Sequence, residues 1–199
     1  MKAIAVVPGS SVQPVDRPEP QISAPDQVKM RVLRVGVCGT DREQIAGGHA
    51  HIPPGQSDMV IGHEVLGQVV EVGAAVTRVR VGDHAVFTVR RGCGQCLPCA
   101  MNRPDMCHTG KYVERGIRLG DGFQSEFVVD AEQFAILVPP SLVSLGILCE
   151  PLSVVEKSLD TVARIQQSRV PDAAATPDWF HGRRCLIAGL GPIDRKSVV

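Results

Sequence analysis

Four cysteines lie within fifteen residues of one another, and their spacing constrains the fold more than any other feature of the chain. The stretch CGQCLPCAMNRPDMC has the pattern C-x2-C-x2-C-x7-C and contains Cys93, Cys96, Cys99 and Cys107. Four thiolates at this spacing can surround one Zn²⁺ tetrahedrally, and four sulfur ligands leave no coordination position for a substrate. We therefore predict a structural zinc site in a lobe of about residues 90–110.

Composition and charge agree with a metal site. The chain has seven cysteines, an odd number, and its first residues do not resemble a secretory signal, so we expect a cytoplasmic protein without disulfides. Four thiolates and one Zn²⁺ carry two net negative charges, which we expect Arg90, Arg91 and Arg103 to offset in part. A nucleic-acid partner is disfavoured, because the 199 residues are neutral, with 21 Lys+Arg and 21 Asp+Glu.

Most of the first 150 residues have the pattern of short β-strands. Val-rich runs such as VKMRVLRVGVC, EVLGQVVEVG and SEFVVD are separated by Gly, Pro and Asp, which is typical of a compact barrel or sandwich. The first residues, MKAIAVV, predict an edge strand. The sequence contains no apolar run close to the roughly 20 residues of a membrane-spanning helix, so no membrane partner is expected.

The pattern changes after Pro151. In EPLSVVEKSLDTVARIQQS the apolar residues recur with helical spacing, and Ser153 followed by Glu156 forms a capping-box pattern. We predict a helix and a linker over residues 153–181. The segment RCLIAGLG then predicts a buried strand and a glycine turn, over residues 182–193.

A second set of possible metal ligands is dispersed along the chain. GVCGTD contains Cys38, Thr40 and Asp41, IGHEVLG contains His63 and Glu64, and CEPLSVVEK contains Cys149 and Glu150. Cysteine, histidine and carboxylate ligands suit a Zn²⁺ that keeps one position for water or substrate. Each motif alone is equally compatible with an ordinary buried cysteine or a hydrogen-bonded His–Glu pair.

Together the motifs resemble the zinc-dependent medium-chain dehydrogenase/reductase family, which is similar to alcohol dehydrogenases. GVCGTD, GHEVLGQVVEVG, VGDHAV and the four-cysteine lobe occur in the order of that family, from residue 1 to 193. FTVRRGCGQC, KYVERGI, DGFQSEF and CEPLSVVEKS are most similar to the glucose 1-dehydrogenases of its sugar and polyol branch. The resemblance implies a mainly β fold: a GroES-like barrel as catalytic domain over residues 1–152, followed by the helix and the first strand of an incomplete Rossmann domain.

The resemblance also implies a catalytic zinc. Cys38 and His63 would bind it, Glu64 would bind it directly or through water, and Glu150 would take the remaining protein position. Cys149 stays an alternative to Glu150. Neighbouring side chains of an extended segment point to opposite faces, so only one of the two would face the metal, and the EPLS pattern favours Glu150.

The implied reaction is the oxidation of an aldose, in first place glucose, at C1, with hydride transfer to NAD or NADP and zinc as the Lewis acid. Thr40 would relay the hydroxyl proton, with an ordinary turn threonine as the alternative. Glu114 in YVERGI would accept hydrogen bonds from sugar hydroxyls, unless it is a solvated surface residue. His49 and His51 either border the substrate entrance or are plain surface histidines. The implied substrate-binding residues are Thr40, Glu64, Glu114 and Glu150.

The implied cofactor site begins near the end of the sequence. The opening of a G-x-G-x-x-G turn is matched by Gly189, Gly191, Pro192 and Ile193, but Asp194 takes the position of the third glycine. Residues 194–199 read DRKSVV, which the adapter-like DNA sequence GATCGGAAGAGCGTCGTG encodes. We therefore expect a non-native tail on a truncated form of a longer protein, inactive or nearly so as it stands.

Two alternatives stay open. The first is another polyol or secondary-alcohol dehydrogenase, which a substrate panel would distinguish. The second is a freestanding zinc-binding interaction domain, in which the strand predicted at residues 184–190 pairs with another chain. For the full-length enzyme we expect a homo-oligomer. The choice between NAD and NADP does not follow from this sequence.

Overall fold

The computed structural model describes residues 1–7, 12–46, 51–169, 180–182, 184 and 186–189. The chain divides into two units, Met1–Ile147 and Leu148–Val199. Several predictions fall outside the described residues, namely those for His49, Gly191, Pro192, Ile193 and the tail 194–199. In the described parts of the chain, no helix is long and apolar enough to cross a bilayer.

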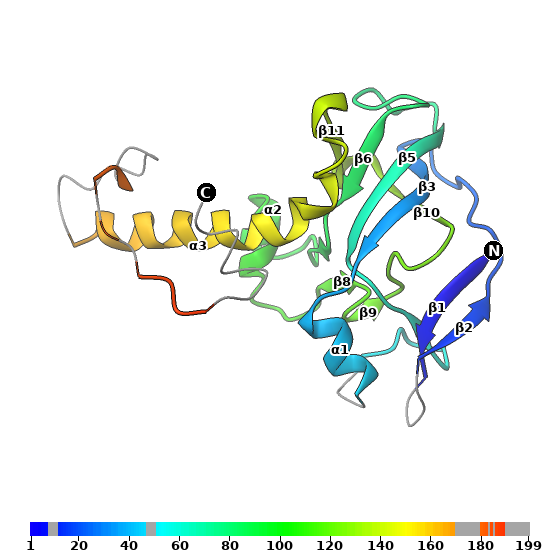
Figure 1. Cartoon of the computed structure of the whole chain (residues 1–199), viewed down its shortest axis with the longest axis horizontal. Helices are drawn as coiled ribbons and strands as arrows, with labels where there is room; N and C mark the ends of the chain where they lie inside the picture. Colours follow the sequence, from blue (N-terminus) through cyan, green and yellow to red (C-terminus); the bar gives the residue numbers. More distant parts are fainter. Residues whose placement is uncertain (8–11, 47–50, 170–179, 183, 185, 190–199) are drawn as a thin grey trace. The chain divides into compact units, whose positions relative to one another are not determined.

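The first unit is built mainly from strands, as predicted (Figure 1). Its largest sheet has five antiparallel strands in the order β10-β3-β5-β6-β11. These strands are β3 (Gln27–Gly36), β5 (Glu64–Val72), β6 (His84–Phe87), β10 (Phe127–Ala131) and β11 (Ala135–Val138). Where β3 pairs with β5 the register shifts twice, and such bulges bend and twist a sheet.

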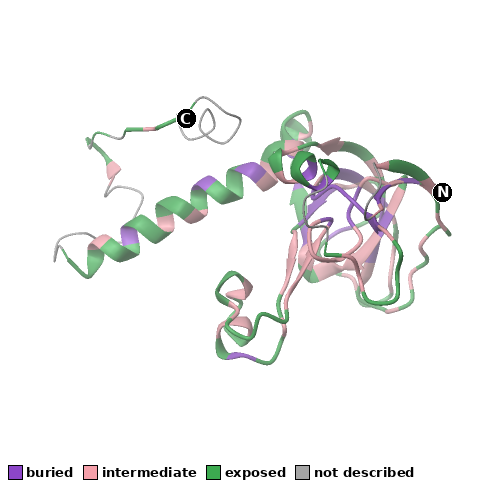
Figure 2. Cartoon of the chain, turned by 90° about the horizontal axis from the view of Figure 1, so that it is seen from below, coloured by how far each residue is buried: buried purple, intermediate pink, exposed green. Residues whose placement is uncertain are grey.

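Alternation along these strands produces the core. The fully buried side chains include Val28, Met30, Val69, Phe87 and Phe123. Figure 2 shows most of the buried segments, in purple, among the strands of the first unit. Short helical segments connect the strands: α1 (Gly39–Ile45), α2 (Leu97–Ala100), and the 3₁₀ turns Pro104–Met106, Glu132–Phe134, Pro140–Leu142 and Gly146–Leu148.

A second sheet has the order β2-β1-β4, with β1 (Lys2–Val6), β2 (Gln13–Asp16) and β4 (Met59–Val60). The predicted edge position of the first strand is wrong, because β1 pairs on both sides. Local sequence could not indicate this, since β4 comes from a segment more than fifty residues later.

A third sheet carries the cysteine lobe. It has the order β7-β8-β9, formed by β7 (Arg90–Arg91), β8 (Val113–Arg115) and β9 (Leu119–Gly120). Residues 92–112 connect β7 to β8, and these two strands pair antiparallel. The lobe therefore begins and ends at the same place on the barrel.

The second unit consists mainly of α3 (Cys149–Gln167). This helix begins four residues before the predicted cap: Leu148 is the N-cap, and Ser153 lies inside the helix, where its Oγ donates to the Glu150 carbonyl at 2.6 Å. Pro151 is accepted because it falls in the first turn, where a backbone N–H has no partner within the helix.

The predicted strand after the linker is not formed by the described residues 182, 184 and 186–189, and the Leu186 side chain is 92% exposed. A strand requires a hydrogen-bonded neighbour, and no described strand pairs with this segment.

Candidate active site and metal centres

The four lobe cysteines converge on one point. Their Sγ atoms all lie within 4.8 Å of one another, with 3.8 Å between Cys93 and Cys99 and 3.9 Å between Cys96 and Cys107. Tetrahedral Zn²⁺ with Zn–S bonds of about 2.3 Å requires sulfur–sulfur distances of about 3.8 Å. The arrangement therefore fits a closed, four-sulfur zinc site, which stays our prediction for these residues.

The lobe thiols cannot all ionise without a cation. Burial, together with the neighbouring thiols of Cys96, Cys107 and Cys93, raises the pKa of Cys99 to about 12. Zinc binding displaces such protons and holds the sulfurs as thiolates. The donor chemistry of the cluster therefore agrees with its geometry.

The three arginines that we expected to offset the thiolate charge are each paired with a carboxylate instead. Arg90 contacts Glu114, Arg91 contacts Asp130, and Arg103 contacts Asp105. Although the three arginines are close to the cysteines in sequence, each pairs with the acid that the fold places beside it. These acids lie on β8, on β10 and in the lobe itself.

Cys38 is held at the N-terminus of α1 by a capping box. Its Sγ accepts the N–H of Thr40 at 3.2 Å, while Oδ2 of Asp41 accepts the Cys38 N–H at 2.9 Å. Cysteine thus takes the position of the usual serine or threonine. The cap fixes the direction of the Cys38 side chain.

His63 and Glu64 meet Cys38 where β5 begins. Cys38 Sγ lies 2.9 Å from His63 Nε2, and one ligand atom from each of the three residues falls within 4.8 Å of the others. Gly36 faces Glu64 across the β3–β5 pair, and a Cβ there would lie 1.8 Å from Glu64 Oε2. The absence of a side chain at Gly36 therefore makes room for the carboxylate.

Asp41 lies in GVCGTD close to the predicted ligand Cys38, and the structure gives it a supporting role that the sequence did not indicate. It is 0% exposed; its Oδ1 accepts the N–H of Gly62 at 3.2 Å and lies 3.6 Å from His63 Nδ1, an ion-pair distance longer than a normal hydrogen bond. A carboxylate behind a metal-binding histidine orients the ring and strengthens it as a ligand. The sequence signal that could have indicated this role is an acidic residue three positions after the cysteine, which is the spacing of a capping box.

The contacts among Cys38, Asp41 and His63 also shift the pKa values of these three side chains. Burial opposes ionisation of Asp41 and His63, but their mutual contact and the bonds to Cys38 outweigh it. They lower the pKa of Asp41 and raise the pKa of His63 to about 10. An imidazolium is thereby held between a carboxylate and a thiol whose own pKa is lowered, and a metal ion would replace those protons.

The segment from β8 to β9, two short strands that pair parallel, packs against the residue before His63 and against α1. Gly116, at φ +73°, packs so closely on Gly62 that a Cβ would lie 2.2 Å from its carbonyl oxygen. Gln44 of α1 donates its Nε2 to the Ile117 carbonyl at 3.2 Å. His51 borders the same segment, since its carbonyl accepts the N–H of Leu119 at 2.7 Å.

Glu150 and Cys149 belong to the second unit, in the first turn of α3, and their assignment as zinc ligands stays a prediction. The expectation that they lie in an extended segment is wrong. In a helix successive side chains are about 100° apart, so the earlier argument that only one can face the metal does not apply. Burial raises the pKa of Cys149. Gly189 has φ +144°, a conformation that favours glycine, and its role in a nucleotide-binding turn stays a prediction.

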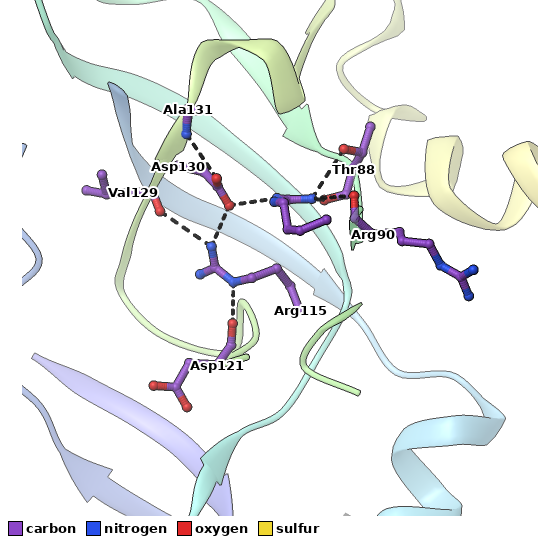
Figure 3. Close-up of polar contacts among 8 residues, drawn as sticks. Thr88, Arg90, Arg115, Asp121, Val129, Asp130 and Ala131 are labelled. Carbon is purple, nitrogen blue, oxygen red and sulfur yellow. Dashed lines mark hydrogen bonds and ion pairs between the residues drawn. The ribbon is translucent and has the colours of Figure 1, made fainter. Parts of the chain in front are cut away.

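A separate ion-pair network fixes the base of the lobe (Figure 3). Asp130 on β10 accepts from Arg91 Nη2 at 2.6 Å and from Arg115 Nη1 at 2.5 Å. The Arg91 guanidinium also stacks on Phe134, 3.8 Å from its ring centroid, and Arg115 Nε donates to the Asp121 carbonyl. One carboxylate therefore joins β7 and β8, the two strands that carry the lobe, to the main sheet.

Comparison with known proteins agrees with this fold. The family model described as "Alcohol dehydrogenase GroES-like domain" matches residues 24–140. The glucose 1-dehydrogenase of Methanocella arvoryzae is 41% identical over 198 residues, covering 97% of this chain and 52% of the relative. Glucose 1-dehydrogenase 2 of Saccharolobus solfataricus is 34% identical, covering 96% and 52%. The chain thus spans about half the length of the curated relatives it matches.

Solved structures are similar as well. The Haloferax mediterranei glucose dehydrogenase in complex with NADP, Zn and gluconolactone has a TM-score of 0.76 and 40% identity, covering 85% of this chain and 47% of its own. Galactitol-1-phosphate dehydrogenase from Escherichia coli has a TM-score of 0.68 and 25% identity, covering 78% and 43%.

Proposed function

Because this chain belongs to the alcohol dehydrogenase GroES-like domain family, we propose that it is the sugar-binding and zinc-binding part of a zinc-dependent glucose 1-dehydrogenase. The reaction would oxidise an aldose, in first place glucose, at C1, with hydride transfer to NAD or NADP. The observation that carries the proposal is the cluster of Cys38, His63 and Glu64, whose ligand atoms lie within 4.8 Å. The similar Haloferax enzyme, with its NADP, zinc and gluconolactone, supports it.

We propose two zinc ions per chain. The lobe cysteines would hold one in a closed, structural site. Cys38, His63 and Glu64 would hold the other, with Glu150 as the proposed further ligand and Cys149 as the alternative. This second zinc would supply Lewis acidity toward a sugar hydroxyl.

Other residues of the chain would orient the metal ligand, transfer the proton and bind the sugar. Asp41 keeps the His63 ring oriented through the contact at 3.6 Å. Thr40, two residues after Cys38 at the start of α1, would carry the hydroxyl proton outward. Glu114 would accept hydrogen bonds from sugar hydroxyls, because an ionised carboxylate is an acceptor only. Gly189 would open the nucleotide-binding turn.

The proposal is tested on the whole protein, meaning the full-length protein that contains this chain. It is loaded with zinc, and the reduction of NAD and of NADP is followed with glucose, galactose, xylose and sorbitol. We expect aldoses to react and glucose to have the highest kcat/KM. His63→Ala should abolish turnover, whereas His108→Ala, an exposed histidine of the lobe, should leave it unchanged. A preference for sorbitol or a simple secondary alcohol would favour the polyol alternative, and no turnover with any substrate would refute the proposal.

Oligomeric state and cofactor preference concern the full-length protein. We propose a homo-oligomer, which light scattering would measure as a multiple of the chain mass. The preferred cofactor is read from the same assay by comparing the KM values for NAD and NADP.

A further inference from the structure

We propose that Arg90 is a positioning residue for sugar binding: its guanidinium fixes the carboxylate of Glu114 so that one carboxylate oxygen is presented to sugar hydroxyls. The inference rests on the proposed function, in which Glu114 contacts the sugar. It adds a residue that does not itself contact the substrate.

The pairing of β7 with β8 places Arg90 directly opposite Glu114. Arg90 donates from Nε at 3.0 Å and from Nη2 at 2.5 Å, and both bonds end on Oε1 of Glu114. Within the described residues, Oε2 of Glu114 accepts no hydrogen bond. The side chain is 18% exposed, so Oε2 keeps its acceptor capacity and is still reached from solvent.

Arg90 is itself held rigidly, which distinguishes this pair from an ordinary surface ion pair. Its guanidinium lies 4.2 Å from the Tyr112 ring centroid, and its Nη1 donates to the carbonyl of Asp105 at 3.3 Å. Arg118 also lies against Tyr112, at 4.6 Å. A stacked guanidinium that donates two bonds to one carboxylate oxygen loses little further freedom, whereas two mobile surface side chains lose much when they pair.

The pair is separate from the network that holds the strands together. Figure 3 shows the side chain of Arg90 turned away from Asp130, toward which Arg115 points. Neighbouring residues of a strand face opposite sides, so Arg91 serves the inner network while Arg90 serves Glu114. Substituting Arg90 should therefore release the carboxylate without detaching the lobe.

The β8–β9 segment that carries Glu114 is fixed against Gly62, the residue before His63. Besides the contact of Gly116 with Gly62, Leu119 is held at φ +58°, a left-handed conformation that is costly for a bulky residue. Its N–H is bonded to His51. Because the backbone is fixed, the rotamer of Glu114 decides where sugar hydroxyls can bind, and Arg90 decides that rotamer.

The test measures KM and kcat for glucose and for each singly deoxygenated glucose in the zinc-loaded whole protein, using Arg90→Ala, Arg90→Lys, Glu114→Gln and the Arg90→Ala/Glu114→Gln double variant. We expect Arg90→Ala to raise the glucose KM about tenfold with kcat changed less than about threefold, because a charge-assisted contact is lost. Arg90→Lys should recover part of the loss. Both single variants should weaken the discrimination against the same deoxy sugar, and the double variant should bind no worse than Glu114→Gln.

Arg103→Ala removes the same charge from the lobe without contacting Glu114 and should leave KM unchanged. If Arg90→Ala does not fold, Arg90→Gln replaces it, and the zinc content of each variant reports its integrity. Independent, multiplying effects in the double variant, or an unchanged deoxy-sugar pattern in Arg90→Ala, would overturn the inference. A wild type that oxidises no sugar would instead refute the proposed function. If Glu114→Gln leaves the discrimination among deoxy sugars unchanged, Glu114 does not contact the sugar and the inference about Arg90 is overturned.

Discussion

Replacing Asp130 by asparagine should destabilise the first unit by about 2–3 kcal/mol. Asp130 is the shared acceptor for Arg91 and Arg115 at 2.6 and 2.5 Å, and the three side chains are only 12–18% exposed. Asparagine has nearly the same shape but no charge, and one of its ends is a donor. It would leave two guanidiniums facing each other without a counterion.

The magnitude follows from the bonds that change. Asp130 Oδ1 also accepts the N–H of Ala131 at 2.9 Å, a bond that asparagine can keep, so only the two contacts to arginine are lost. A hydrogen bond to a charged group contributes about 1.5 kcal/mol, which gives about 3 kcal/mol for two. Partial access of water to the guanidiniums reduces this to about 2–3 kcal/mol.

Equilibrium unfolding in urea at constant, saturating zinc would measure the effect. With a slope of about 2 kcal/mol/M for a unit of this size, the midpoint should fall by about 1–1.5 M. Asp16→Asn is the matched control, because Asp16 pairs with Lys2 on the surface, with side chains 78% and 71% exposed, and its midpoint should not move. Equal shifts in both variants would show that the Asp130 network does not hold the strands as argued.

Three further predictions concern metal content, backbone strain and pH. The purified zinc-loaded protein should contain two zinc ions per chain by atomic absorption, and Cys96→Ser should lose one; a wild type with a single zinc would mean that one cluster does not assemble. Gly116→Ala should cost about 2 kcal/mol or more in urea unfolding, because its Cβ would lie 2.2 Å from a carbonyl oxygen, whereas Gly110→Ala, at φ +69° with open space, should cost about 1 kcal/mol. The backbone N–H of Arg78 lowers the pKa of Glu132 below its ordinary 4.5. The ionised carboxylate therefore stabilises the fold fully above pH 4.5, and this stabilisation is lost as the pH falls through the lowered pKa. Glu132→Gln should make the free energy of unfolding less dependent on pH in this acid range, and an unchanged pH dependence would contradict the prediction.

Local features of the fold were predictable from sequence. The lobe ligands lie within fifteen residues, so their spacing alone limits the geometry, and the structure brings the four sulfurs together. The Val-rich runs VKMRVLRVG and EVLGQVVEV predicted β3 and β5, because β-branched residues favour strands. The motifs also identified the family correctly.

Boundaries and neighbours were less predictable. The helix α3 begins at Cys149 because Pro151 is tolerated in a first turn, which a capping-box pattern at Ser153 obscured. The strand β1 lies inside its sheet because β4 pairs with it from a distant segment. Such outcomes depend on contacts between segments that no local pattern encodes.

The sequence by itself therefore determined the chemistry that is available: four clustered thiols, a dispersed Cys, His and Glu, and a β framework. Only the tertiary structure decided which groups meet. Cys38 and His63 are 25 positions apart and come within 2.9 Å because an N-cap and the start of β5 adjoin. Arg90 and Arg91 are identical neighbours in sequence, yet one pairs with Glu114 and the other with Asp130. The physical reason is that the strand pleat turns successive side chains to opposite faces, and the pairing register then determines which acid each one meets.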